Sequence, residues 1–173
     1  MRIIEVLPYD EGWVALFERE EALLRRIFSE ELVAIHHIGS TSIKGMKAKP
    51  IIDIMPVVKD IDRVHLYDDA MRKIGYEPKG ENGINGRRYF QKGGDQRTHH
   101  VHIFQEGHPD IQRHLAFRDY VGSHPEAMAA YAKRKEELAE KYRLDSVAYA
   151  NGKSGLVRQI DEAALAWYLS RAR

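Results

Sequence analysis

Apolar residues near the N-terminus recur at spacings of three and four, which predicts an amphipathic helix over residues 10–28. Its apolar face includes Trp13, Phe17 and Leu24, and Asp10 is the expected N-cap. Two strands should follow this helix, over 32–38 and 50–58, with a turn or short helix at 40–49 between them. The second strand (PIIDIMPVV) is apolar on both faces, which is typical of a strand in the middle of a sheet.

The remaining pattern predicts a helix, a hairpin and then three helices. Gly75 should end the helix, and the glycines near residue 93 should form the turn of the hairpin. Residues 78–86, rich in Gly and Asn, should form a loop. The expected ranges are helix 61–74, strands 87–91 and 98–105, and helices 109–121, 125–142 and 146–171. This order predicts an α+β fold with a small mixed sheet flanked by helices and a helical C-terminal tail, in one domain over 1–173.

Composition narrows the class of protein. The chain has 173 residues, 43% of them hydrophobic and 31% charged, with a net charge of +1, which favours a soluble globular protein over a nucleic-acid or membrane binder. The chain has no cysteine, so disulfides and thiolate metal sites are excluded. Neither a signal peptide nor a run of roughly 18 apolar residues is visible, and the expected location is therefore cytoplasmic.

Gly39 and Ser40 follow the first predicted strand directly and are candidates for binding phosphate. Glycine lets backbone N–H groups approach an anion closely, and the serine hydroxyl adds a hydrogen-bond donor. A Gly-Ser pair is common, so the signal is weak alone. Asp53 strengthens it, because a carboxylate inside the most apolar stretch needs a polar partner or a metal.

The combination of these residues resembles the polymerase-β-like nucleotidyltransferases. Within that superfamily, the stretch HHIGSTSIKGMKAKPIIDI is similar to the GrpB family of bacterial proteins, which also occur fused to dephospho-CoA kinase. The similarity extends over nearly the whole chain, through Trp13 and Phe17, the THHVHIF strand, LAFRDY at 115–120, and Tyr149 with Lys153. The resemblance implies a fold and a site, in which Gly-Ser holds a nucleotide triphosphate and strand carboxylates bind a divalent metal.

The sequence departs from the superfamily at Met55. Active members usually carry Asp-x-Asp on this strand, and methionine cannot bind Mg²⁺. His100 and His102 are two residues apart on a predicted strand and should share one face. In nucleotidyltransferase folds this strand lies beside the one that carries the first carboxylate. Two imidazoles and Asp53 would suit Zn²⁺, Mn²⁺ or Fe²⁺ better than Mg²⁺. The histidines could equally form hydrogen bonds without a metal.

Basic residues supply further candidates for phosphate binding. Lys44 flanks the Gly-Ser turn, Arg88 lies on the hairpin, Arg118 lies in FRDY, and Lys153 lies in the last helix. Each has a solvated surface charge as its alternative reading. The run at 133–137 (KRKEE) predicts a solvated helix face, and Asp161 should cap a helix or form a salt bridge. His36 and His37 could add a metal ligand, or one of them could pack against the sheet.

Three functional readings remain open. The favoured one is metal-dependent nucleotidyl or phosphoryl transfer to a small acceptor, with Asp53 as the catalytic residue. The second is a non-catalytic module that binds a nucleotide or CoA and has lost the second carboxylate, as Met55 suggests. The third, nucleic-acid binding, is disfavoured by the balanced charge. A homodimer is an open expectation. The spacing Gly94, His100, His102, Glu106 partly matches a cupin metal motif, but the helical C-terminal third rejects that all-β fold.

Overall fold

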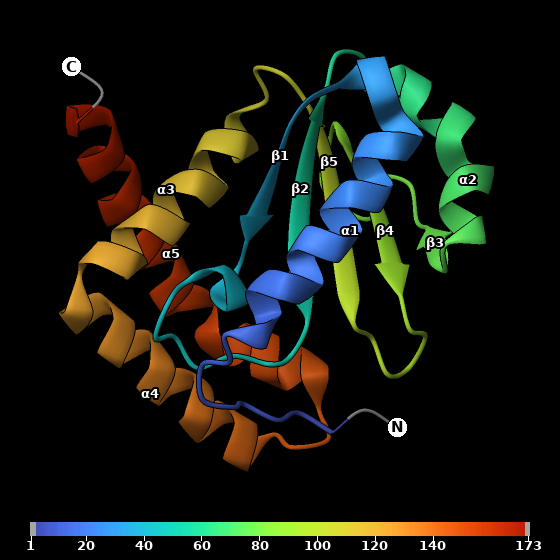
Figure 1. Cartoon of the computed structure of the whole chain (residues 1–173). Helices are drawn as coiled ribbons and strands as arrows, with labels where there is room; N and C mark the ends of the chain where they lie inside the picture. Colours follow the sequence, from blue (N-terminus) through green and yellow to red (C-terminus); the bar gives the residue numbers. More distant parts are fainter. Residues whose placement is uncertain (1–2, 172–173) are drawn as a thin grey trace.

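The computed structural model describes residues 3–171 and places a five-stranded sheet at the centre of the molecule (Figure 1). The strand order across the sheet is β1-β2-β5-β4-β3. The strands are β1 (Leu32–Ile38), β2 (Ile52–Val58), β3 (Tyr76–Pro78), β4 (Arg87–Lys92) and β5 (His99–Gln105). The helices are α1 (Gly12–Phe28), α2 (Asp68–Lys73), α3 (Pro109–Ser123), α4 (Pro125–Lys141) and α5 (Ser146–Arg171). Short 3₁₀ helices span Ser29–Glu31, Ser40–Ser42 and Ile61–Tyr67.

The register of β2 decides which side chains meet in the middle of the sheet. β2 pairs antiparallel with β1 and parallel with β5. Asp53 lies opposite Ile38 in the first pair and opposite His100 in the second. Because paired residues point to the same face, the end of β1, Asp53 and the histidines of β5 share one side of the sheet.

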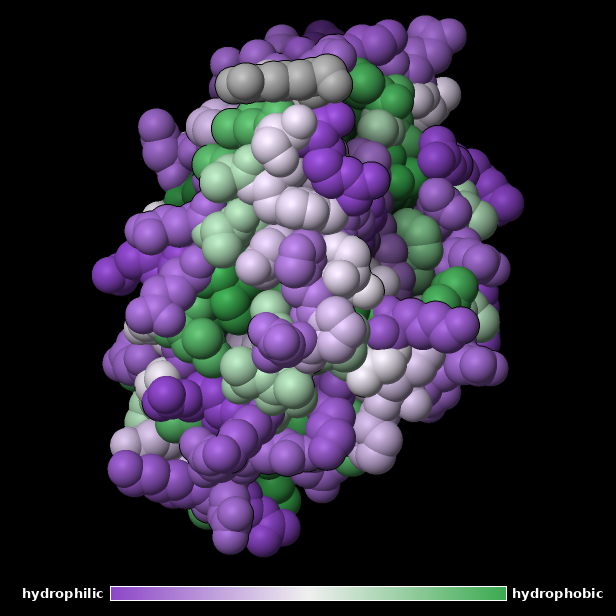
Figure 2. Space-filling model, turned by 90° about the vertical axis from the view of Figure 1, so that its left-hand side faces the viewer, coloured by the Kyte–Doolittle hydropathy of each residue, from purple (hydrophilic) through white to green (hydrophobic). Residues whose placement is uncertain are grey.

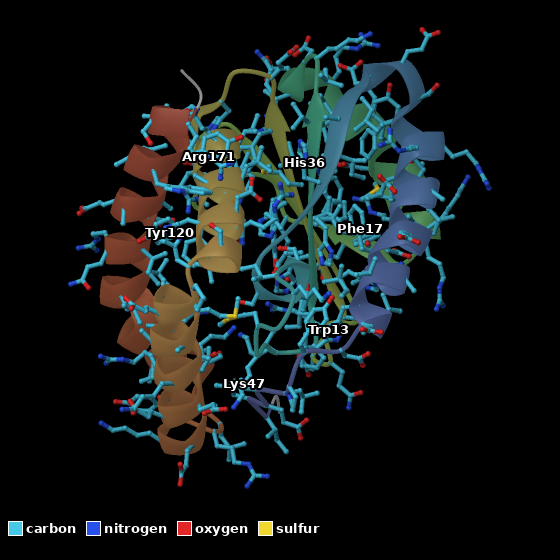
Figure 3. All side chains as sticks on the ribbon, turned by 60° about the vertical axis from the view of Figure 1, so that its left-hand side comes forward. Trp13, Phe17, His36, Lys47, Tyr120 and Arg171 are labelled. Carbon is cyan, nitrogen blue, oxygen red and sulfur yellow. The ribbon has the colours of Figure 1, made fainter. Side chains whose placement is uncertain are left out.

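Helices cover both faces of the sheet. Helices α1 and α2 lie on one face, and α3, α4 and α5 gather on the other (Figures 1 and 3). The buried face of α1 carries Trp13, Leu24 and Phe28, which pack with Ile54 of β2 in the main core cluster. This face of the sheet therefore carries the main apolar core, with buried Glu20 of α1 bonded to Tyr76 and Lys92 at its edge, whereas Asp53 lies on the other face.

The outer surface of the three C-terminal helices is mostly polar, unlike the apolar core beneath α1. Figure 2 views the molecule from their side and shows mainly hydrophilic residues, with apolar side chains interspersed among them.

Pro109 and Pro125 each occupy the first turn of a helix, where a missing N–H costs no hydrogen bond. Among the helices of residues 3–171, none has the length and hydropathy that crossing a bilayer requires.

The expected α+β class, with a small mixed sheet, flanking helices and a helical C-terminal part, is confirmed. The helix predicted over residues 61–74 differs in type along most of its length. Residues 61–67 form a 3₁₀ helix, and only Asp68–Lys73 are α-helical. Ile61, Val64 and Tyr67 all pack against the core cluster, and a three-residue repeat lies on one face in a 3₁₀ helix rather than an α-helix.

The second difference is strand β3, which was not predicted; it follows Gly75 directly and ends at Pro78, where the predicted loop begins. It pairs with β4 through Tyr76, Glu77 and Pro78. The strand has only three residues and lies at the edge of the sheet, so it is too short to show an alternating pattern.

Leu24→Ala is expected to lower the free energy of unfolding by about 2–5 kcal/mol, because Leu24 is fully buried in the main core cluster. The matched control is Leu16→Ala on the same helix, since Leu16 is 37% exposed and should change stability by less than about 1 kcal/mol. Urea denaturation followed by circular dichroism measures both. Equal losses for the two variants would contradict the assigned orientation of α1.

Candidate functional site

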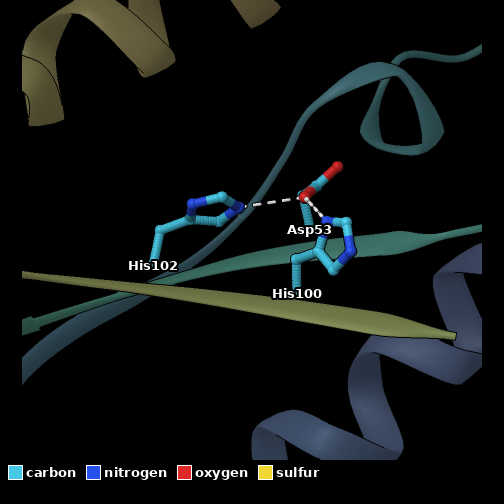
Figure 4. Close-up of side chains that lie close together, drawn as sticks. All are labelled: Asp53, His100 and His102. Atoms are coloured by element: carbon cyan, nitrogen blue, oxygen red, sulfur yellow. Dashed lines mark hydrogen bonds and ion pairs between the residues drawn. The ribbon is translucent and has the colours of Figure 1, made fainter. Parts of the chain in front are cut away.

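Asp53 and two histidines of the neighbouring strand meet on the polar face of the sheet (Figure 4). His102 Nε2 lies 3.0 Å and His100 Nδ1 lies 3.4 Å from the same carboxylate oxygen, Oδ1 of Asp53. The parallel register of β2 and β5 creates this arrangement, because it sets His100 directly beside Asp53 and brings His102 to the same face. The two histidines therefore lie beside Asp53, as expected, and ligation of a metal by the three residues stays a prediction.

Gly39 closes the other side of the carboxylate. A Cβ atom added to Gly39 would lie 2.6 Å from Oδ2 of Asp53, which is closer than any side chain tolerates. The residue also has a φ of 72°, a conformation that glycine adopts without strain. The glycine is therefore required here for two reasons, the turn after β1 and the close approach of Asp53.

The charge of Asp53 is held by its neighbours. Burial alone would raise the pKa of the carboxyl, but hydrogen bonds from His100 and His102 outweigh it and hold the pKa well below its usual range. Asp53 is therefore ionised at neutral pH and available as a ligand.

The contacts of His102 favour one tautomer of its ring. Arg87 Nη1 can only donate and lies 3.4 Å from His102 Nδ1, which favours a neutral ring with its proton on Nε2, facing Asp53. A metal bound through Nε2 would replace that proton and move it to Nδ1, where it would face Arg87. The long Arg87 contact would then have to break.

The donor set fits a divalent metal. One carboxylate oxygen and two imidazole nitrogens lie within 4.8 Å of one another, the one such group of three found between residues 3 and 171. Imidazole nitrogen is a ligand for Zn²⁺, Mn²⁺ or Fe²⁺ more than for Mg²⁺. Met55, the position of the missing carboxylate, is completely buried and packs with Ile38 and Phe104.

A cavity of about 280 Å³ opens beside Asp53 and His100. Gly39 and Ser40 line it from the turn after β1, and helices α3, α4 and α5 supply the opposite wall. This volume is at the small end of ligand pockets, which favours a compact ligand over a polymer.

Lys135 of α4 is the most deeply buried of the basic residues that line this cavity. It is 2% exposed, and its ammonium donates to Ser40 Oγ at 2.7 Å and to the Lys47 carbonyl at 2.9 Å. Burial lowers the pKa of Lys135 to about 7, and the positive charges of Lys153 and Lys49 add to the shift. The prediction that residues 133–137 form a solvated face is wrong for Lys135, because α4 turns this position toward the Gly-Ser turn.

Sequence reasoning also missed part of the α3 wall. His114 and Arg113 both line the cavity, and burial lowers the pKa of His114 to about 3, so the ring is neutral. Arg113 approaches Asp161 of α5 at 3.6 Å, which agrees with the salt bridge expected for Asp161. The spacing of Lys153, Val157 and Asp161 by four residues was the signal that one face of α5 enters the cavity.

The cationic residues predicted to bind phosphate are divided among three places. Lys153 lines the Asp53 cavity together with Gly39 and Ser40. Lys44 and Arg118 line a separate cavity of about 640 Å³ near the end of α5, where Arg118 binds Asp119. Arg88 lies on β4 near Asp62 and Glu81 and lines neither cavity.

His36 and His37 do not join the metal-ligand group found among the described residues. His37 stacks on Phe17 of α1 with ring centroids 4.8 Å apart and hydrogen-bonds Thr41. His37 is therefore a packed strand residue, which was one of the two alternatives, and it lies on the face of the sheet opposite Asp53.

The fold and this site define an α+β protein with a cationic cavity beside a candidate metal group, and comparison with known proteins places it in a family. The family model described as GrpB protein matches residues 3–163. The chain therefore belongs to the GrpB family, as its sequence resemblance implied.

Two proteins illustrate the similarity. The UPF0157 protein YqkA of Bacillus subtilis is 47% identical over 98% of this chain and 50% of its own length, so the chain spans about half of that relative. The crystal structure of the conserved protein GrpB from Enterococcus faecalis aligns with a TM-score of 0.92 and 40% identity, covering 95% of this chain and 99% of that one.

Two more distant matches complete the comparison. A dephospho-CoA kinase of Mycolicibacterium paratuberculosis is 23% identical over 95% of this chain and 46% of its own length, in keeping with the fusions implied by the resemblance. A structure of the Cid1 poly(U) polymerase bound to MgATP aligns over 76% of this chain and 45% of that one, with a TM-score of 0.47 and 14% identity. A similarity this low carries no argument about activity.

His102→Ala is expected to weaken Mn²⁺ or Zn²⁺ binding by at least roughly tenfold, because it removes one of three candidate ligands. The control His65→Ala changes an exposed histidine that bonds only the Asp62 carbonyl. Isothermal titration calorimetry with each metal measures the affinity of both variants and of the wild type. Unchanged affinity in His102→Ala would show that the metal binds elsewhere.

Proposed function

We propose that the cavity binds a nucleoside triphosphate together with a divalent metal and transfers a nucleotidyl or phosphoryl group to a small acceptor. One observation carries this proposal: Asp53 and His100 of the candidate metal group line the same small cavity as Lys135, a buried lysine that donates to Ser40 of the Gly-Ser turn. In this scheme Asp53, His100 and His102 hold the metal. Ser40 donates a hydrogen bond to the phosphates, and Lys135 and Lys153 neutralise their charge.

The transfer step needs little covalent chemistry from the protein. An acceptor hydroxyl oxygen bonds to a phosphorus of the triphosphate, and the bond to the leaving phosphate oxygen breaks. For attack on the α-phosphorus the leaving group is pyrophosphate, and the hydroxyl proton passes to solvent or a base. The contribution of the chain is to align the phosphates and to stabilise their developing charge with Lys135 and Lys153.

The backbone around Ser40 supports phosphate binding rather than a purely structural turn. Ser40 begins the 3₁₀ helix at Ser40–Ser42, and Gly39 before it is extended with a positive φ. Such turns present backbone N–H groups to an anion. Lys49 and Lys153 flank the ring of Tyr149 at 4.9 and 5.1 Å, so two further ammonium groups border the cavity beside Lys135.

A second candidate function is a non-catalytic module that binds a nucleotide or CoA. Met55 favours it, because a fully buried thioether replaces the second carboxylate of the strand. This leaves three protein ligands for one metal, whereas two-metal phosphoryl transfer uses more oxygen ligands. Lys44, Arg88 and Arg118 lie outside the Asp53 cavity, so under either function any phosphate contact they make is to a part of the ligand beyond it.

The transfer reaction predicts metal-dependent release of pyrophosphate or phosphate. The protein is incubated with Mn²⁺ or Zn²⁺, one of the four nucleoside triphosphates, and a mixture of small hydroxyl acceptors. Asp53→Asn should abolish release, whereas Asp69→Asn, which changes an exposed carboxylate paired with Arg72, should not. Metal-dependent nucleotide binding without turnover would leave the binding module, and no binding of metal or nucleotide would reject both functions.

Nucleotide affinity should depend on pH through Lys135. Since the pKa of Lys135 is lowered to about 7, its ammonium is charged below that pH and loses its proton above it. Affinity should therefore fall between about pH 6 and pH 8. Lys135→Met should bind roughly 10- to 100-fold more weakly at the lower pH and lose most of the dependence.

Lys133→Met is the matched control, because Lys133 lies on the same helix and is exposed. It should keep the wild-type pH profile, which includes any titration of the nucleotide itself. Fluorescence anisotropy with a labelled nucleotide measures all three proteins. A wild-type affinity that rises with pH would contradict the assignment of Lys135.

A further inference from the structure

Asp161 is a buried acceptor that the proposed chemistry does not use. Its Oδ2 approaches Arg113 at 3.6 Å, but within the described residues its Oδ1 is buried without a hydrogen-bond partner. A buried carboxylate oxygen without a donor has lost its hydration and gained nothing in return. Asp161 lines the same cavity as Asp53 and its side chain is 19% exposed, so a rotation of the carboxylate would let a ligand there supply the missing donor.

Helix α5 contributes a row of residues along the wall of the cavity. Lys153, Val157 and Asp161 follow at four-residue intervals and all line the cavity. Eight residues of α-helix separate the cationic end at Lys153 from the Asp161 end by roughly 12 Å. Val157 of α5 lies between them, and two aromatic residues of the adjoining helices, Phe117 and Tyr131, also line the cavity and meet edge to face with ring centroids 5.5 Å apart.

This order of groups matches the order of groups in a nucleotide. The cations at the Lys153 end suit the phosphates, with Asp53 and His100 lining the same cavity, the apolar residues suit a flat ring, and Asp161 with Arg113 can contact the polar edge of that ring. The edge contact consists of an acceptor with a free lone pair beside a guanidinium donor. It can therefore distinguish nucleobases by the sequence of donors and acceptors that they present.

Resting on the proposed function, we infer that Asp161 determines base specificity and selects a guanine nucleotide. Guanine presents O6, N1–H and the N2 amino group in a row along one edge. The carboxylate of Asp161 can accept from N1–H and N2–H, while Arg113 donates to O6. Adenine and cytosine present one amino donor next to a ring nitrogen acceptor, and uracil presents one N–H between two carbonyls. In each of these three bases the second carboxylate oxygen would face a lone pair.

The remaining contacts of Arg113 hold it beside Asp161. Its Nε donates to Asp110 Oδ1 at 3.3 Å, and its Nη2 donates to His114 Nε2 at 3.3 Å. These bonds fix the guanidinium between α3 and α5, and Nη1, which lies 3.6 Å from Asp161 Oδ2, has a second N–H for the base. Asp161 and Arg113 thus act as a pair held by contacts within α3 and α5.

The test changes which base the site should prefer instead of removing base recognition. Asp161→Asn replaces two acceptors by one acceptor and one donor. Xanthine differs from guanine by a carbonyl in place of the N2 amino group, so it complements the amide and repels the carboxylate. Affinities for GTP, ATP, CTP, UTP and XTP are measured by calorimetry in the presence of Mn²⁺. The wild type should prefer GTP by at least roughly tenfold, and Asp161→Asn should prefer XTP over GTP.

Asp119→Asn is the control, because it makes the same substitution in a carboxylate that borders the other cavity, and it should keep the preference for GTP. Equal wild-type affinities for the four common nucleotides would overturn the inference while leaving the proposed function standing. A uniform loss for all five nucleotides in a folded Asp161→Asn protein would also overturn it. Absence of any nucleotide binding in the wild type would reject the proposed function and the inference with it. The wild-type ranking tests the inference even if the variant fails to fold.

Discussion

The contact between Asp53 and the two histidines of β5 is the constraint on which the rest of the site depends. A carboxylate in the middle of a sheet loses much of its hydration, and it stays ionised here because His100 and His102 replace that hydration with hydrogen bonds. The arrangement requires β2 and β5 to be parallel neighbours in one register. It also requires glycine at position 39, since any side chain would collide with the carboxylate. One pair of strands and one turn therefore position the candidate metal ligands beside the candidate phosphate contacts.

Much of the fold could be predicted because its elements carry strong periodic patterns. The apolar spacing of α1 and the continuous apolar run of β2 led to the right elements within a few residues. Strand β3 was missed because three residues at a sheet edge hold no period to detect. The sequence predicts an α-helix at the 3₁₀ segment Ile61–Tyr67 because the three-residue repeat of that segment overlaps with the spacings of an α-helix.

The site was predictable only where strand geometry governs it. The side-chain period of two put His100 and His102 on one face, and the superfamily topology put that face beside Asp53. Lys135 could not be found in this way, because it lies in a run of charged residues that suits a solvated helix. Its burial follows from how α4 packs against the Gly-Ser turn, which is a contact between residues 95 positions apart. Lys44 shows that closeness in sequence can also mislead, because it is four residues from Ser40 yet borders a different cavity.

Replacement of the second carboxylate by methionine changes the charge of the site as well as its ligands. Two carboxylates would neutralise one divalent metal, whereas Asp53 with two neutral imidazoles would leave one unit of positive charge on the occupied site. Lys135 lies near this charge, and its pKa of about 7 in the metal-free state would fall further when a cation binds. An anionic ligand reverses that effect by stabilising the ammonium. A bound metal and the charged ammonium of Lys135 therefore repel each other. A phosphate group bound between them relieves this repulsion. Ser40 joins the two, because its hydroxyl already accepts from Lys135 on the turn that adjoins Asp53. On this argument the metal and the phosphate ligand should bind cooperatively, whether or not transfer follows.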